Sequence, residues 1–267
     1  MAEADAALRI VPLPQIVAKG KWRTEALHTV HHHLILWFTK GQGRLVISGK
    51  RRVFAANSVV YLPAGTPHAF EVKPGTFGSA VEIAPHETLD LPSVPILQRT
   101  RDLLLHSEFV SLFEAMQREA GRKPMSDRAC RLHAGILALW LERQPNELST
   151  GSAQSASERL ATRYSALIEA RFASGANVQT MADELGVTPT HLSRVCKASM
   201  GLSAHELLTQ RTMYAARDLL AGTDRPVNRI SENLGFSSPA YFTRAFQKTT
   251  GLTPSAFRSG TRPEVKN

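Results

Sequence analysis

The sequence predicts an α+β protein with two domains: a β-barrel that carries a helical hairpin, and an all-α domain with an internal repeat. Residues 30–84 contain short, evenly spaced segments rich in β-branched and aromatic residues. From about residue 93 the apolar residues change to helical spacing. A polar, Ser-rich segment at 145–157 separates this region from a last part that is helical throughout. The length of 267 residues is enough for two domains.

Four segments of the N-terminal domain, assigned to residues 1–92, are predicted strands. They are LILWFT (34–39), RLVISG (44–49), SVVYLP (58–63) and HAFEV (68–72), with Gly or Pro residues between them. Regular short strands separated by turns are typical of a sandwich or a barrel.

The region 93–144 contains two predicted helices joined by the turn sequence GRKP. Apolar residues recur every three or four positions from Leu103 to Met116 and again from Leu132 to Leu141. The two helices carry more apolar surface than they can hide from each other. This surface packs against the barrel or forms a dimer interface, and a homodimer is therefore expected.

The segment 145–157 is predicted to be a flexible linker, because it is polar, rich in Ser and without periodicity. The C-terminal domain is assigned to residues 158–267.

Composition limits the classes of function. The net charge of +9 and the pI near 9.9 permit nucleic acid or another anionic partner without establishing one. The two cysteines are far apart in the chain, which fits a reducing cytoplasm. The N-terminus lacks the pattern of a secretory signal, and no apolar run is long enough to span a membrane. We therefore expect a cytoplasmic protein with no membrane partner.

Two segments of the C-terminal domain resemble each other, Thr180 to Ser203 and Arg229 to Thr253. Each runs through a short helix, Leu-Gly, a turn with Ser or Thr, a second helix containing Arg, and then Gly-Leu-Ser/Thr. Matched positions supply a small residue at the helix crossing (Ala182, Ser231), a turn glycine (Gly186, Gly235), a cap (Thr188; Ser237 or Ser238) and an inner apolar face (Met181, Leu185, Leu192, Val195; Ile230, Leu234, Phe242, Phe246). This is the layout of two helix-turn-helix units, at about 178–199 and 227–250.

The second helix of each unit has outward side chains suited to DNA. Arg244 and Gln247 have the chemistry to read guanine and adenine, whereas Tyr241 and Lys248 suit phosphate. The alternative is a plain helical bundle with a solvated outer face, and His191 fits a solvated residue as well as a DNA contact. The candidate DNA-binding residues are Thr188, Thr190, His191, Ser193, Arg194, Lys197, Ser237, Ser238, Ala240, Tyr241, Thr243, Arg244, Gln247 and Lys248.

The segment Ser203 to Leu220 lies between the units and contains no Pro or Gly. A long uninterrupted helix here would hold the second helices at a fixed separation. They would then enter successive major grooves, about 34 Å apart on one face of DNA.

The C-terminal domain resembles the DNA-binding domain of the AraC/XylS family of bacterial transcriptional regulators over roughly Ala156 to Arg258. The most specific segment is GFSSPAYFTRAFQKTTGLTPSAFR, Gly235 to Arg258. Thr212 departs from the basic residue or Gln usual in the family, which puts a phosphate contact there in doubt although Arg211 is adjacent. Cys196 stands where an aromatic residue is common, which implies a smaller core in the first unit.

The N-terminal domain is similar to the cupin-like effector domain of many such regulators. PAGTPH (63–68) matches part of the second cupin motif and HHH (31–33) part of the first, but the expected Glu is missing. His31, His33 and His68 are possible ligands for Zn, Fe or Ni, and Glu82 and His86 are possible further donors. Without the carboxylate, the favoured expectation is no metal and no cofactor. The candidate effector-binding residues are His33, Trp37, Tyr61, His68, Phe70 and Glu82, each of which is alternatively ordinary core.

These features favour a ligand-responsive transcription regulator that binds promoter DNA and is not an enzyme. What the resemblance implies is an activator that contacts RNA polymerase and senses a small molecule. The alternatives are a metal-dependent cupin enzyme, such as a dioxygenase or isomerase, fused to a DNA-binding domain, and a DNA-binding protein that senses no ligand.

Overall fold

The structure is a computed structural model that describes residues 8–18, 20–84, 91–99, 102–122, 126–148 and 155–261. These residues form two compact units, one holding most of the chain up to Ser155 and the other holding the chain from Ala156 onward. The middle of the predicted linker, 149–154, lies outside the described residues, as does His86. The linker and the domain bounds drawn from the sequence therefore stay predictions.

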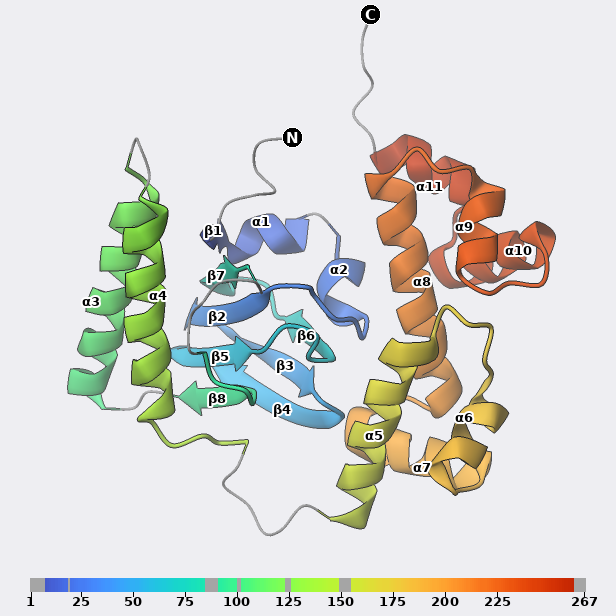
Figure 1. The fold of residues 1–267 in the computed structure, drawn as a ribbon, viewed down its shortest axis with the longest axis horizontal. Coiled ribbons are helices and arrows are strands. Elements are labelled where there is room, and N and C mark those ends of the chain that lie inside the picture. Colours follow the sequence, from blue (N-terminus) through green and yellow to red (C-terminus); the bar gives the residue numbers. More distant parts are fainter. Residues whose placement is uncertain are drawn as a thin grey trace, which may run out of the picture. The chain divides into compact units, whose positions relative to one another are not determined.

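The first unit contains two antiparallel sheets (Figure 1). The strand order is β1-β7-β2-β5-β8 in the five-stranded sheet and β4-β3-β6 in the three-stranded sheet. The strands are β1 (Leu8–Pro12), β2 (His33–Lys40), β3 (Gln42–Ile47), β4 (Lys50–Ala55), β5 (Ser58–Leu62), β6 (His68–Val72), β7 (Phe77–Ile83) and β8 (Ile96–Arg99). Two short helices, α1 (Leu13–Ala18) and α2 (Trp22–Glu25), lie between β1 and β2 in the chain.

The α+β fold class is confirmed, but the strands form two open sheets and not a closed barrel. In the described ranges, β1 and β8 are the edges of one sheet and β4 and β6 the edges of the other, and no pairing joins these edges. The helical region predicted from residue 93 begins instead with a strand, because β8 pairs with β5 at the edge of the larger sheet.

The five-stranded sheet is buried on both faces. On β2, Ile35 belongs to the core shared with the helical hairpin, whereas Leu36 and Phe38 belong to the core between the two sheets. On β5, Tyr61 belongs to the core shared with the hairpin and Val60 to the core between the sheets. Since successive side chains of a strand point to opposite faces, a sheet covered on both sides needs nearly continuous apolar strands, as β2 and β5 are.

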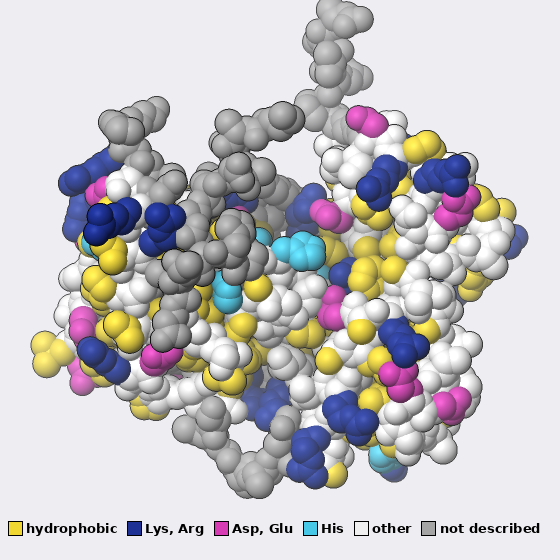
Figure 2. Space-filling view, in the orientation of Figure 1, with side chains coloured by type: hydrophobic (Ala, Val, Ile, Leu, Met, Phe, Trp, Pro, Cys, Tyr) yellow, Lys and Arg dark blue, Asp and Glu magenta, His cyan; other side chains and the backbone are white. Residues whose placement is uncertain are grey.

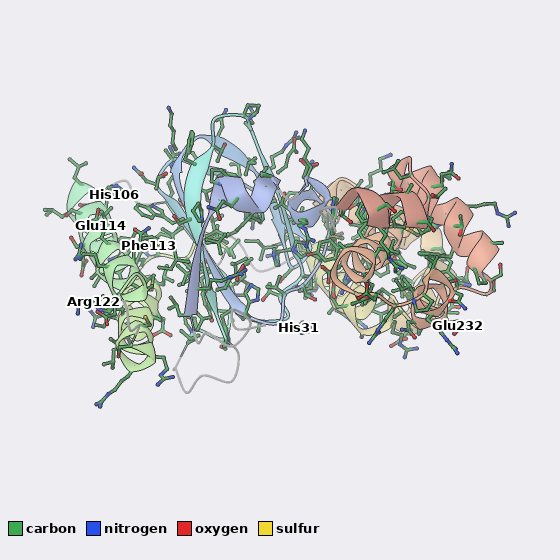
Figure 3. The ribbon with its side chains drawn as sticks, turned by 90° about the horizontal axis from the view of Figure 1, so that it is seen from above. His31, His106, Phe113, Glu114, Arg122 and Glu232 are labelled. Atoms are coloured by element: carbon green, nitrogen blue, oxygen red, sulfur yellow. The ribbon has the colours of Figure 1, made fainter. Side chains whose placement is uncertain are left out.

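Helices α3 (Leu103–Ala120) and α4 (Asp127–Glu142) form the expected hairpin and cover one face of the larger sheet (Figures 1 and 3). Phe113 of α3 packs toward the sheet, its ring centroid 4.8 Å from that of Trp37. Trp140 of α4 donates a 3.1 Å hydrogen bond from Nε1 to the Glu108 carboxylate of α3. The packing interpretation is therefore correct for the inner face of the hairpin.

The second unit is entirely helical. Its helices are α5 (Ala156–Arg171), α6 (Val178–Leu185), α7 (Pro189–Met200), α8 (Ala204–Gly222), α9 (Val227–Asn233), α10 (Pro239–Thr250) and α11 (Pro254–Thr261). Figure 1 shows α6 and α7 toward the start of α8, and α9 to α11 toward its end. The long helix therefore lies between the two helix pairs, as the sequence predicts.

Candidate nucleic-acid interface and effector site

The first helix pair, α6 and α7, has the local geometry of a helix-turn-helix unit. Gly186 ends α6 with a φ of 73°, a left-handed conformation that glycine adopts without strain. The Thr188 hydroxyl accepts a 3.2 Å hydrogen bond from the His191 amide and caps α7, whose first residue is Pro189. Ala182 is fully buried where the two helices cross. The sequence predicted each of these roles.

The second pair, α9 and α10, repeats this geometry. Gly235 also has a φ of 73°, and Ser231 is fully buried at the position of Ala182. Of the two candidate caps, Ser238 is the one that accepts a hydrogen bond from the Tyr241 amide, at 3.2 Å. Ser237 is exposed and does not cap the helix. Phe242 is buried beneath α10 as an anchor of the helix.

The outward residues of α7 form a polar, basic face. Thr190, Arg194 and Lys197 are exposed, while His191 and Ser193 are half-buried. The Arg194 guanidinium donates a 3.0 Å hydrogen bond to Nδ1 of His191. His191 therefore orients a neighbouring cation, a role that neither sequence interpretation of this residue included.

The outward residues of α10 form a second such face. Ala240, Tyr241, Arg244, Gln247 and Lys248 are all exposed. The Thr243 side chain is half-buried, and its hydroxyl donates to the Pro239 carbonyl four residues earlier in the helix. Its hydrogen bond is already used within the helix, which makes it the weakest of the base-reading candidates on α10.

Charge is segregated between the helices of each pair. Neither α7 nor α10 contains Asp or Glu. The first helices hold the carboxylates, and these already have partners, Asp183 with Gln179, Glu184 with Arg171 and Glu232 with Arg229. The second helices therefore present cations that no acidic residue of their own helix offsets.

Helix α8, which lies between the pairs, is stabilised at its start and again further along its length. Ser203 and Glu206 form a reciprocal capping box at its start. Further along, the Arg211 Nε lies 2.8 and 2.9 Å from the carboxylate oxygens of Glu169, and its guanidinium stacks 3.8 Å above the Phe172 ring. Arg211 and Thr212 are both buried. Neither side chain is thus available for a phosphate contact, and no feature of the sequence indicated that Arg211 faces inward.

The structure does not bring the six candidate effector residues together. His33, Trp37 and Tyr61 face the hairpin, and the Tyr61 hydroxyl lies 2.9 Å from Nδ1 of His33. His68 and Phe70 line the space between the sheets. Glu82 pairs with Arg9 at 2.7 Å and lies 3.9 Å from His32.

The space between the sheets is nearly filled by side chains. Its cavity is about 10 Å³, room for one water at most. Within the described ranges, no group of three or more His, Cys, Asp or Glu residues is placed to hold a metal ion. The effector site predicted around His68 therefore stays a prediction.

The chain matches the family model of a helix-turn-helix domain over residues 181–260 and that of an AraC-like ligand binding domain over residues 17–141. It is 35% identical over 92 residues to the probable transcription factor PqrA of Proteus vulgaris, a match covering 34% of this chain and 75% of that protein. The chain belongs to the AraC family of transcriptional regulators.

Two other proteins are similar to a part of this family member. The arabinose operon regulatory protein of Escherichia coli (strain K12) is 30% identical over 91 residues, which cover 34% of this chain and 31% of that protein. The C-terminal domain of AraT, a response regulator from Geobacillus stearothermophilus, is similar in structure, with a TM-score of 0.38 and 30% identity over 43% of this chain and 95% of that one. The matched segment spans about a third of the length of the arabinose regulator.

Proposed function

We propose that this regulator binds double-stranded promoter DNA in a sequence-specific manner, with α7 and α10 in successive major grooves. The observation that carries the proposal is the matched pair of capped helix-turn-helix units on one uninterrupted helix. Helix α8 has 19 residues and is therefore about 28 Å long at 1.5 Å per residue. That length is close to the separation of about 34 Å between neighbouring major grooves on one face of the duplex.

The full-length protein tests this proposal directly. Fragments of the source genome are selected by binding, and the affinity for the selected site is titrated at several salt concentrations. Binding by a basic surface to phosphates must weaken steeply with salt, and the selected site must bind more tightly than shuffled DNA. Equal affinity for every duplex would reject sequence-specific binding.

We also propose that the first unit senses a small molecule and that the regulator activates transcription through RNA polymerase. Its match to a ligand binding domain model supports the sensing role. Sensing requires a ligand that binds one state of the protein better than another. Transcription in vitro from a selected promoter, with and without the protein, tests the sign of regulation.

The outer face of the hairpin is proposed as a homodimer interface. Figure 2 shows hydrophobic side chains exposed along α3 and α4. They include Leu132, Ile136 and Leu139 on α4, which are 61%, 48% and 51% exposed, and Leu103 and Leu104 at the start of α3. Contiguous exposed apolar residues on a helical surface mark interaction sites.

We infer a regulator without enzymatic activity or cofactor, acting in the cytoplasm where promoter DNA is found. The named relatives are transcription factors, which supports this inference. In the described part of the chain, no helix has the length and hydropathy needed to cross a membrane. Metal analysis of the purified protein tests the enzyme alternative, since stoichiometric Fe or Zn that is lost in His68→Ala would favour a metal-dependent enzyme.

A further inference from the structure

A cleft of about 630 Å³ opens in the first unit at one end of the two sheets. Its walls come from the starts of β3 and β5, from the ends of β4, β6 and β8, and from Glu147. His33 and His68 begin β2 and β6, so they lie at the other end of the sheets. The cleft is therefore separate from the positions that the cupin resemblance indicates.

Both sheets contribute cations to this cleft. Arg99 ends β8 in the larger sheet, whereas Lys73 directly follows β6 in the smaller sheet. Arg44, the third cation of the lining, is paired with Glu71 at 3.3 Å. Within the described ranges, the side chains of Lys73 and Arg99 form no ion pair or hydrogen bond. The lining thus holds two cations without a side-chain partner among the described residues, Lys73 and Arg99, together with the carboxylate of Glu147.

The cleft also has an apolar wall. Val53 on β4 lines the cleft and is 73% exposed, one of the largest exposures of any apolar side chain in the unit. Burial of such a side chain by a ligand is favourable, at about 25 cal/mol for each Å² removed from water. A ligand that satisfies this wall and both cations has an apolar body and an anionic head.

We propose that this cleft binds a small organic carboxylate, whose head is held by Lys73 and Arg99 and whose apolar body covers Val53. The guanidinium fork of Arg99 matches the two oxygens of a carboxylate, and the Lys73 ammonium adds a point charge. The ligand bridges the two sheets and so joins their open ends. The inference rests on the proposed sensing function and names the chemical class of its effector.

Calorimetric titration of the full chain tests the site. The probe is cyclohexanecarboxylate within a set of carboxylates of graded size, compared with the neutral cyclohexanecarboxamide and with inorganic phosphate. Carboxylates bind, and the carboxamide and phosphate bind much more weakly. Arg99→Gln and Lys73→Gln each raise Kd by about tenfold, because each removes one charge-assisted contact. Arg118→Gln, which removes an exposed cation on α3, leaves Kd unchanged.

Four results would overturn the proposal: no binding by any carboxylate, equal binding of the carboxamide, equal binding of phosphate, or unchanged affinity in both cleft variants. All three cations are on the surface, and thermal unfolding confirms that each variant folds. DNA affinity is measured in the same samples. Carboxylate binding that leaves DNA affinity unchanged supports the site and rejects the sensing role, so the two claims fail separately.

Discussion

Arg244 and Lys248 lie one turn apart on the exposed face of α10, yet they are expected to act differently on DNA. Arg244→Ala should weaken binding to the selected site by about 1–3 kcal/mol and relax base preference at one position, because a base contact is lost. Fluorescence anisotropy with the selected site and its single-base variants measures both effects. Full retention of affinity and preference would show that Arg244 does not contact a base.

Lys248→Ala is the matched substitution for a phosphate contact. It should weaken binding to all DNA sequences alike. It should also reduce the slope of log affinity against log salt concentration by about one, because one fewer counterion is released. Losses of affinity that differ from one DNA sequence to another would count against a phosphate contact.

Ser231 offers a test of core packing inside the repeat. Its hydroxyl is fully buried and forms no hydrogen bond with any residue that the structure describes, and the first helix pair has Ala182 at the same position. Ser231→Ala should stabilise α9 and α10 by about 1 kcal/mol, because an unsatisfied buried hydroxyl is removed. The reciprocal Ala182→Ser should destabilise the first pair. Amide hydrogen exchange in these helices measures both, and slower exchange in Ala182→Ser would contradict this explanation.

His68 links the stability of the first unit to pH. Burial lowers its pKa to about 4, although the hydrogen bond to the Thr66 carbonyl raises it and the nearby His32 lowers it further. The unfolded chain takes up a proton near pH 6.5 and the folded unit does not, so stability falls as pH drops from 6.5 to 4. The full loss is about 3 kcal/mol.

His68→Asn keeps a donor for the Thr66 carbonyl but does not titrate, and it should flatten this dependence. All three tryptophans, at positions 22, 37 and 140, lie in the first part of the chain, so tryptophan fluorescence follows urea unfolding of that unit. An equally steep fall in the variant would assign the pH dependence to other groups.

Among the elements, the hairpin has two faces with different roles. Phe109 and Phe113 pack on the sheet, whereas Leu132 and Ile136 are exposed. Replacing Leu132 and Ile136 together by Glu should weaken dimerisation by 100-fold or more, at about 1.5–3 kcal/mol for each buried side chain. Sedimentation velocity measures the effect. Val94→Glu is the control, because Val94 is 56% exposed outside the hairpin. A wild-type protein that sediments as a monomer at every concentration would exclude this interface.

The strands show where sequence reasoning is sufficient and where it is not. β2, β3, β5 and β6 were predictable, because buried strands between turn glycines are apolar and β-branched. β4 was missed because half of its sequence, KRRVFA, is basic and because it lies at a sheet edge, where its hydrogen bonds come from β3. β8 is another edge strand, with only four residues. Pairing with a neighbour defines such strands more than their own composition does.

The candidate sites also differ in how far the sequence alone predicts them. Caps and turn glycines of the helix pairs are local features, so Thr188, Gly186 and Gly235 could be assigned from their neighbours in the chain. The direction of Trp37 or Phe70 depends on which layer covers each face of a sheet, and this is a tertiary property. The cleft residues Lys73 and Arg99 come from different sheets and have no shared sequence signal.

In the whole molecule, we propose DNA binding for the second unit and ligand binding for the first. Within the second unit, the buried pair of Arg211 and Glu169 ties α8 to α5, and the capping box fixes its start. We therefore expect this long helix to hold α7 and α10 at a fixed separation, so that the pair does not adapt to altered spacing on DNA.

Methylation interference at the selected site, with the full-length protein, tests this fixed spacing. Modification is expected to block binding at two major-groove segments about one helical turn apart on the same face, for each protomer bound. Insertion of five base pairs between these segments must then reduce affinity to the nonspecific level. A single contacted segment for each protomer, or unchanged affinity after the insertion, would contradict it.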